Sequence, residues 1–384
     1  MHISYLDNAA TTPVDERVLK IMLPYFSDKY GNPGSMHQKG LEAKEAVDEA
    51  RKTIAKLISA EPNEIIFVSG GTESDNLAII GTAMALKEKG NHIITTNIEH
   101  HAVFDTCEYL EEQGFKVTYV GVKENGIIDP KDIEKTITPK TILISIMHAN
   151  NEIGTIQPIA EISKIAKSKD IIMHTDACQS AGYLDIDVNK LGVDLMTLNG
   201  SKIYGPKGIG ILYAKKGTIL QPLIYGGGQE KGVRSGTENV PLIVGFAKAL
   251  EIAHSVRDKE SKRLIKLRDK LVAGLKKKIS NIHINGDLEK RLPNNVNISF
   301  LGVEGESMLL HLDSKGICAS TGSACSSHSL EPSHVIKALG LTDEASHGSL
   351  RFTLGRHTTE EDIEKVLKEL PKIVESLRKI SPIA

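Results

Sequence analysis

Short apolar runs alternate with helical periodicity between about residues 64 and 215, and this alternation restricts the chain to a narrow class of folds. Strands that alternate with helices favour a mostly parallel sheet covered by helices. The sequence therefore predicts an α/β fold for this part of the chain. The runs expected to form its strands are 65–68, 92–96, 116–121, 141–147, 171–175, 194–198 and 209–214.

The pattern changes after about residue 240. A long, charged amphipathic stretch covers 241–280, and it is followed by strands expected at 296–300 and 349–354 and by a helix expected at 360–379. We interpret the long stretch as the connector between a large domain and a smaller carboxy-terminal domain.

The composition is that of a globular protein, with 384 residues, 40% of them hydrophobic and 25% charged. A formal net charge of −2 gives no electrostatic reason to bind nucleic acid or an anionic membrane. We find no signal peptide and no apolar run near the roughly 18 residues that span a bilayer. Four cysteines are too few for a disulfide scaffold in a chain of this length, so we expect a cytoplasmic protein.

Lys202 lies just after the expected strand 194–198, in the glycine-rich segment 198–210. At the end of a strand, among small residues, an amine can be held close to a bound ligand, as a Schiff-base lysine requires. The alternative is a solvated surface lysine beside a glycine-rich turn.

A pyridoxal phosphate enzyme also needs a carboxylate for the pyridine nitrogen, an anion site and a group against the ring. Asp176 ends the expected strand 171–175 and suits the nitrogen, although it could instead cap a helix. The segment 69–76 places two glycines before a helix, which suits a phosphate, or else forms an ordinary capped turn. His100 follows the expected strand 92–96 and could stack on the ring, or could be a surface or capping residue.

Cys325 lies in the segment 317–332, which is rich in small residues. A thiolate on a loop of this kind can reach a substrate, whereas the alternative is a loop cysteine without a role. A metal site formed by Cys318, Cys325, His328 and His334 is disfavoured, because seven residues separate the two cysteines. We therefore predict no metal site.

Taken together, these motifs resemble the first group of the NifS/IscS-type cysteine desulfurases, in the class V aminotransferase family. The resemblance implies the fold of the type I pyridoxal phosphate transferases, with a mixed, mostly parallel sheet in the large domain and a smaller α+β domain. It divides the chain into a large domain, 13–250, and a small domain, 1–12 and 251–384, with the cysteine loop at about 318–331. The segments that carry it are 5–12, 31–35, 71–76, 99–100, 148–154, 176–180, 198–210, 234–237, 317–332 and 351–356.

The resemblance also implies roles in binding pyridoxal 5'-phosphate. Lys202 would bind the cofactor and later carry a proton, Asp176 would contact the pyridine nitrogen, and His100 would stack on the ring. Further cofactor contacts are implied for Gly71, Thr72 and Gln179, the last at the phenolic oxygen, and for Thr237, which would reach the phosphate of the neighbouring subunit in a homodimer.

One position departs from the family. A histidine usually precedes the lysine, with a serine two places before that histidine, and both contact the phosphate. Here those positions hold Ser201 and Asn199, which we expect at the phosphate in their place. Asn151 and Arg351 would bind the substrate carboxylate, for which a planar arginine fork is suited, although Arg351 could instead form a surface ion pair.

The implied activity converts L-cysteine to L-alanine, with Cys325, Lys202 and His100 as catalytic residues. The sulfur would form a persulfide on Cys325 and pass to an acceptor protein, such as an iron–sulfur scaffold. Two other enzymes on the same scaffold, a selenocysteine lyase and a small-substrate aminotransferase, stay open, as does a non-catalytic scaffold for sulfur-transfer partners. The sequence does not choose between iron–sulfur cluster assembly and the thiolation of tRNA or cofactors.

Overall fold

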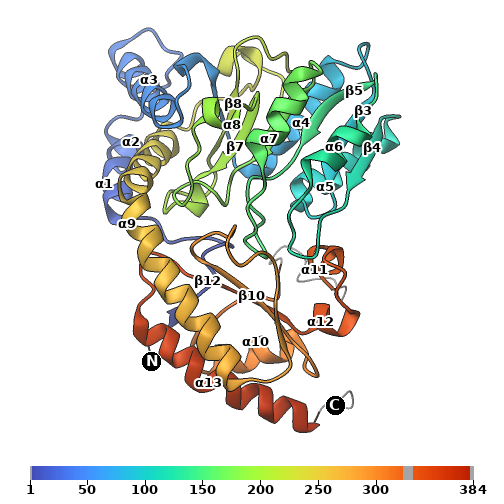
Figure 1. The fold of residues 1–384 in the computed structure, drawn as a ribbon. Helices are drawn as coiled ribbons and strands as arrows, with labels where there is room; N and C mark the ends of the chain where they lie inside the picture. The colour runs from blue at the N-terminus through green and yellow to red at the C-terminus, as the bar shows by residue number, and fades with distance from the viewer. Residues whose placement is uncertain (1, 323–331, 381–384) are drawn as a thin grey trace.

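The computed structural model describes residues 2–322 and 332–380, and a seven-stranded sheet forms its larger unit (Figure 1). Only β8 runs antiparallel to its neighbours β2 and β7, and the other pairs are parallel. The strands, in their order across the sheet, are β2 (Ile65–Val68), β8 (Gly210–Ala214), β7 (Leu195–Asn199), β6 (Ile172–Asp176), β5 (Thr141–Ser145), β3 (His92–Thr96) and β4 (Lys116–Val120).

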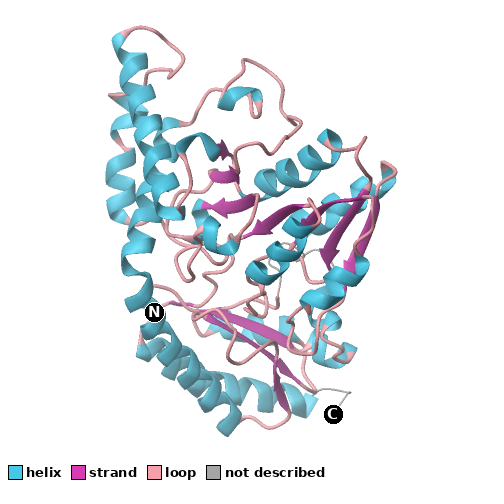
Figure 2. Cartoon of the chain, turned by 45° about the horizontal axis from the view of Figure 1, so that its top comes forward, coloured by secondary structure: helices cyan, strands magenta, loops and turns pink. Residues whose placement is uncertain are grey.

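The predicted mostly parallel sheet is confirmed, and every expected strand in it is present to within two residues. The interior strands β3 and β5 are buried along their whole length, which explains the apolar residues at their centres, Ile93 and Ile94 in β3 and Ile142–Ile144 in β5. Helices flank the sheet (Figure 2), with α4 packed on β7 and β8, α5 on β4 and α7 on β6. The helices that follow these strands are α4 (Gly71–Ala85), α5 (His101–Glu112), α6 (Pro130–Thr136), α7 (Ile159–Ser168) and α8 (Val188–Leu191).

Helix α9 (Val240–Lys278) joins the two units and runs along one side of the molecule (Figure 1). Asn239 caps its first turn, where Pro241 is tolerated because that turn needs no amide donor. Residues up to Ala253 pack in the core beside the sheet, and residues from Leu264 onward pack in a second core. The helix confirms the long amphipathic stretch expected at 241–280.

The second unit has a small antiparallel sheet in the order β12-β10-β9 and a parallel pair, β1 with β11. Leu6, near the start of the chain, is buried in its core beside residues from β10, β12 and α13. The expected elements at 296–300, 349–354 and 360–379 are confirmed. The elements of this unit are β1 (Ser4–Tyr5), β9 (Ile282–Ile284), β10 (Asn295–Phe300), α10 (Gly305–Ser314), β11 (Ile317–Cys318), α11 (His334–Ala338), α12 (Asp343–His347), β12 (Ser349–Thr353) and α13 (Glu360–Ile380).

Three helices that the sequence analysis did not predict, α1 (Glu16–Met22), α2 (Pro24–Ser27) and α3 (Gln38–Ile58), pack against α9. The described residues also form three short 3-10 helices: η1 (Pro62–Glu64), η2 (Gly200–Lys202) and η3 (Glu230–Gly232). Within the described residues, we find no helix with the length and apolar character needed to cross a membrane.

Candidate active site

A cavity of about 230 Å³ opens where the carboxyl ends of β6 and β7 face the second unit. Most of the residues singled out from the sequence line it together, although their strands and helices are distant in the chain. The predicted residues that line it are Gly71, Thr72, His100, Asn151, Asp176, Gln179, Asn199, Lys202 and Arg351.

The amine of Lys202 is held at the wall of the cavity by the N-terminal segment. Lys202 ends η2, directly after β7, and its Nζ donates to the carbonyl oxygens of Ala9 at 2.9 Å and Ala10 at 2.6 Å. The Gln179 amide donates to the same Ala9 oxygen at 3.0 Å. Thr12 fixes the segment from the other side, because its Oγ1 donates to the Ser201 carbonyl at 2.9 Å. The lysine is therefore positioned at the end of its strand, as predicted.

A layer of buried polar groups lies beneath Asp176. The Asp176 carboxylate accepts a hydrogen bond from the Cys178 amide at 2.8 Å, but the residues that follow form a turn and not a helix, so the helix-cap alternative is wrong. Asp75 is fully buried, and its Oδ1 has no hydrogen-bond partner within the described part of the chain. Burial raises the pKa of Asp75 well above its usual range, and the nearby Asp176 charge adds to this shift, so the neutral acid is favoured.

His174 completes this layer. Its Nε2 lies 3.1 Å from Thr197 Oγ1 and 3.6 Å from Asp75 Oδ1, and its Nδ1 lies 2.8 Å from Ser145 Oγ. Burial lowers the pKa of His174 to about 4, so the ring is neutral at neutral pH. The sequence analysis gave neither Asp75 nor His174 a role, because a polar residue inside a strand or helix gives no signal of what lies next to it.

His100 both lines the cavity and caps α5. Its Nδ1 accepts the Ala102 amide at 3.0 Å, which requires an unprotonated nitrogen. Burial lowers the pKa of His100, which favours the same neutral ring. The sequence offered a capping role and a position beside the cofactor as alternatives for His100. In the structure, His100 caps α5 and also lines the cavity.

The amino terminus of α4 forms one wall of the cavity. Its first residues, Gly71 and Thr72, leave N–H groups without partners inside the helix, which suits an anion. A side chain at position 71 would be crowded, since a Cβ there would lie 3.0 Å from Cys178 Sγ and 3.4 Å from Asn199 Nδ2. Only a glycine leaves this wall open for a close ligand.

Two predicted cofactor contacts are not in this cavity. Ser201 is partly buried, and both its amide and its hydroxyl donate to Asn199 Oδ1 at 3.1 Å, while Asn199 itself lines the cavity. Thr237 is exposed and does not line the cavity of its own chain. The expected phosphate contacts of Ser201 and Thr237 stay predictions.

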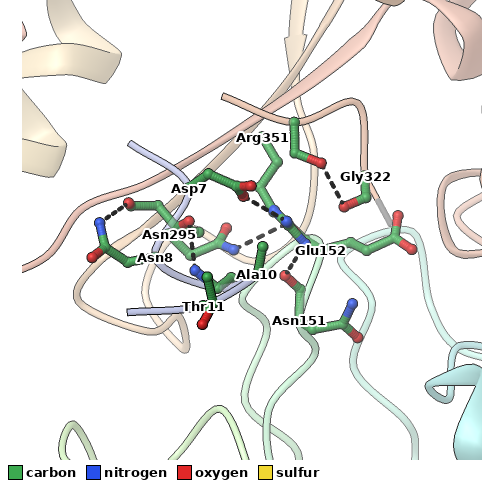
Figure 3. A network of polar contacts seen from close by, with 12 residues as sticks. Asp7, Asn8, Ala10, Thr11, Asn151, Glu152, Asn295, Gly322 and Arg351 are labelled. Carbon is green, nitrogen blue, oxygen red and sulfur yellow. Dashed lines mark hydrogen bonds and ion pairs between the residues drawn. The ribbon is translucent and has the colours of Figure 1, made fainter. Parts of the chain in front are cut away.

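Arg351 is 2% exposed and faces the cavity from β12 (Figure 3). Its Nη2 pairs with Asp7 Oδ1 at 2.9 Å, and its Nη1 donates to the Asn151 carbonyl at 3.1 Å. Its Nε has no hydrogen-bond partner among the residues that the structure describes. The ion pair is therefore buried instead of lying on the surface. Nη1 and Nη2 each make one of these contacts, so each keeps a second N–H that can donate to a carboxylate.

Cys325 lies outside the described residues. Of the three cysteines that the structure describes, Cys107 and Cys178 are buried and Cys318 is partly buried in β11. Burial raises the pKa of each of these thiols, which disfavours the reactive thiolate. None of the three has the character of an activated nucleophile.

Comparison with known proteins places this site in a family. The aminotransferase class-V family model matches residues 4–366. The cysteine desulfurase IscS of Dictyoglomus turgidum is 55% identical over 378 residues, which cover 98% of this chain and 96% of that protein. The cysteine desulfurase IscS of Methanosarcina thermophila is 54% identical over 379 residues, which cover 99% and 94%.

Solved structures agree with these sequence matches. A NifS-like protein has a TM-score of 0.92 at 41% identity, covering 98% of this chain and 100% of that one. The structure of SspA in complex with cysteine has a TM-score of 0.82 at 39% identity, covering 93% and 100%. The chain therefore belongs to the class-V aminotransferases, and within them to the cysteine desulfurases of the IscS/NifS type. The type I pyridoxal phosphate transferase fold implied by the resemblance is confirmed.

Proposed function

We propose that this protein binds pyridoxal 5'-phosphate at Lys202 and L-cysteine at Arg351, and that it transfers the cysteine sulfur to Cys325. One observation carries the proposal: an amine at a strand end and a buried arginine line the same cavity. The cavity therefore offers a covalent anchor for an aldehyde and a charged donor for an amino-acid carboxylate.

The residues present fit the cofactor. Asp176 is a carboxylate at the cavity wall that can accept a pyridinium N–H, and the Gln179 amide lies beside the Lys202 amine, where a phenolic oxygen would need a donor. The helix terminus at Gly71 has no side chain to exclude a phosphate. When bound, the cofactor acts as an electron sink for the substrate's α-carbon.

The chain's own groups would then divide the work. Arg351 and Asn151 orient the amino acid through its carboxylate, and Lys202 carries the proton removed from the α-carbon. His100, neutral and partly buried, supports the flat ring. The Cys325 thiolate attacks the substrate sulfur: a sulfur–sulfur bond forms, the carbon–sulfur bond breaks, and its electron pair stays on the carbon, which gains a proton and yields alanine.

Assembly and destination are further parts of the proposal. We propose a homodimer in which Thr237 reaches the phosphate of the neighbouring subunit, since Thr237 is exposed and outside its own cavity. A monomer that sedimented alone with full activity and cofactor content would contradict this. The persulfide would pass to an acceptor protein in the cytoplasm, such as an iron–sulfur scaffold, and a pull-down of the persulfide form would identify it.

We also propose the domain division 13–250 against 1–12 with 251–384. The two separate hydrophobic cores support it, because Leu6 packs in the second core and the first half of α9 in the first. The other enzymes open from the sequence, a selenocysteine lyase and an aminotransferase, are not favoured by relatives named as cysteine desulfurases. If the division is correct, a cut by limited proteolysis within 254–263, between the buried residues Ala253 and Leu264 of α9, should leave two folded pieces that stay associated through residues 1–12.

The test is the substitution Cys325→Ser, which keeps the size of the side chain but replaces the thiol by a far poorer nucleophile. Alanine and sulfide release from L-cysteine should fall to background, while the visible absorption of the cofactor is kept. Cys318→Ser is the matched control and should keep turnover near that of the unmodified protein. If Cys325→Ser retained activity and Cys318→Ser lost it, the nucleophile would have to be assigned to position 318.

A further inference from the structure

Glu152 lies where the two units meet, and both of them fix its backbone. Its side chain and backbone are 1% exposed. Its carbonyl oxygen accepts amides from Asn295 at 3.0 Å and Asn297 at 3.1 Å, both on β10 of the second unit. Its own amide donates to Asn150 Oδ1 at 2.8 Å, on the side of the large sheet. The hydrogen bonds of its backbone thus fix the position of Glu152 independently of any contact that its carboxylate makes.

The carboxylate lies close to both ends of 323–331, the segment that contains Cys325. It is near Gly322, directly before the segment (Figure 3), and near Ser333, the second residue after it. Ser333 Oγ donates to Glu152 Oε2 at 2.5 Å. On the other side, a Cβ built on Gly322 would lie 2.8 Å from that same oxygen, and Gly322 has φ +123°, a conformation that favours glycine. One buried oxygen therefore lies against both ends of the segment.

The first end is tied to the strand that carries the substrate arginine. Ser320 and Arg351 exchange backbone hydrogen bonds of 3.1 and 2.6 Å, and the Ser320 hydroxyl donates to the Gly322 carbonyl at 3.2 Å. Arg351 in turn donates to the carbonyl of Asn151, the residue before Glu152. Gly322, Glu152 and Arg351 are thus connected through Ser320 and Asn151.

The second end is tied to the large unit. Ser333 caps α11 by accepting the amides of Val335 and Ile336, and the ring of His334 contacts the carbonyl of Glu99, the residue before His100, at 2.9 Å. Side chains of α11 pack in a small apolar cluster with Ile98 and Ile153. The Glu152–Ser333 hydrogen bond adds a polar link to this packing.

We propose that Glu152 is a positioning residue that fixes the two ends of the segment 323–331 relative to Arg351 and Asn151. The inference rests on the proposed role of Cys325 as the sulfur acceptor. Fixing both ends of a short segment lowers the number of conformations that a residue within it can adopt, and it raises the effective concentration of a thiol at the substrate. Glu152 would do this without lining the cavity itself.

The main test compares Glu152→Ala with Glu152→Gln. The glutamine keeps the shape and an oxygen that can accept the Ser333 hydroxyl, whereas the alanine removes it. We expect Glu152→Ala to lower kcat for alanine formation by about tenfold or more, with the KM for L-cysteine within about twofold, because a misplaced reactive group costs rate and not binding. Glu152→Gln should restore kcat to within about threefold of the unmodified protein.

A second pair of variants tests the link from its other end. Ser333→Ala removes the hydrogen bond to Glu152 together with the cap of α11, and Thr342→Ala removes only the equivalent cap of α12, where Thr342 Oγ1 accepts the Ala345 amide. Ser333→Ala should lower kcat as Glu152→Ala does, and Thr342→Ala should not. If Glu152→Ala fails to fold, this pair decides the question.

A measurement without turnover separates this inference from the proposed function. We expect the rate at which iodoacetamide alkylates Cys325 in the resting protein, read by mass spectrometry, to change by about threefold or more in Glu152→Ala and Ser333→Ala only. An unchanged alkylation rate with unchanged kcat in both variants would overturn the positioning role. Retained activity in Cys325→Ser would instead overturn the proposed function, whatever the alkylation rates.

Discussion

The two sides of the active site are built in different ways. The cofactor side, defined as Thr72, His100, Asp176 and Lys202, lies at the ends of strands and the starts of helices in one sheet. The substrate side, defined as Asp7, Asn151 and Arg351, joins segments as far apart as the 344 residues between Asp7 and Arg351. The residues of the first side all come from elements of the large unit, although the N-terminal segment holds the Lys202 amine, whereas the residues of the second side come from both units.

The electrostatics of the two sides differ in the same way. Beneath the cofactor side, burial favours neutral forms of Asp75 and His174. The substrate side contains an ion pair between Arg351 and Asp7, 2.9 Å apart, with the arginine almost fully buried. Changes on the cofactor side should therefore act on cofactor binding, and changes on the substrate side on the affinity for the amino acid.

The largest expected effect is on the cofactor side, from Lys202→Ala. Removing the amine that anchors the cofactor should lower desulfurase activity by about a thousandfold or more, the scale seen when a covalent catalytic group is deleted. Borohydride treatment of the unmodified protein should fix the cofactor to a Lys202 peptide and remove the visible absorption. Lys207→Ala, at an exposed lysine five positions later, is the control and should change neither result. A reduced label found on Lys207 would refute the assignment.

A smaller effect is expected on the substrate side, from Arg351→Lys. The lysine keeps a positive charge near Asp7 but loses the planar fork, which is worth about 1.5–3 kcal/mol for a charged hydrogen bond, so KM for L-cysteine should rise about tenfold to a hundredfold. Cofactor absorption should not change. Arg356→Lys is a matched control, because Arg356 pairs with Asp15 outside the cavity. An unchanged KM in Arg351→Lys would mean that the carboxylate binds elsewhere.

The smallest effect is expected from Ser201→Ala, which returns to the cofactor side. The Ser201 hydroxyl donates to Asn199 Oδ1 instead of lining the cavity, and a neutral hydrogen bond contributes about 0.5–1.5 kcal/mol, so the cofactor dissociation constant should rise only severalfold. Asn199→Ala should raise it more. The reverse order in equilibrium dialysis would indicate that Ser201 contacts the phosphate directly.

The fold could be predicted wherever a segment showed its own periodicity. The buried strands were identifiable as apolar runs, and α13 was identifiable because Ile363, Val366 and Leu370 recur at helical spacing. Helix α3 has a similar pattern, but several of its buried positions are alanines such as Ala43 and Ala50, which weaken the apolar contrast. The two-residue strands β1 and β11 had no local signal, because they exist only through their pairing across 313 residues of chain, from Ser4 to Ile317.

The residues of the site also differ in whether the local sequence gave a signal for them. Asp176 and Lys202 could be proposed from the sequence, since strand ends in an α/β sheet gather at one edge. The role of Arg351 came only from the family resemblance, because nothing near position 351 indicates that Asp7 and Asn151 lie beside it. Glu152 was not singled out at all: a glutamate between two polar residues and an isoleucine looks like an ordinary turn residue until Gly322 and Ser333 are seen on either side of it.

The N-terminal segment has a consequence for how the protein is made. Asn8 and Ala9 hydrogen-bond Thr353, about 345 residues later, while Ala9 and Ala10 supply the carbonyls that hold Lys202. At a synthesis rate of about 5–20 residues per second, the first residues to leave the ribosome wait roughly 20–70 s for the strand that they join. The active site is therefore among the last parts of the molecule to form, and a nascent chain that lacks β12 has no means to assemble it.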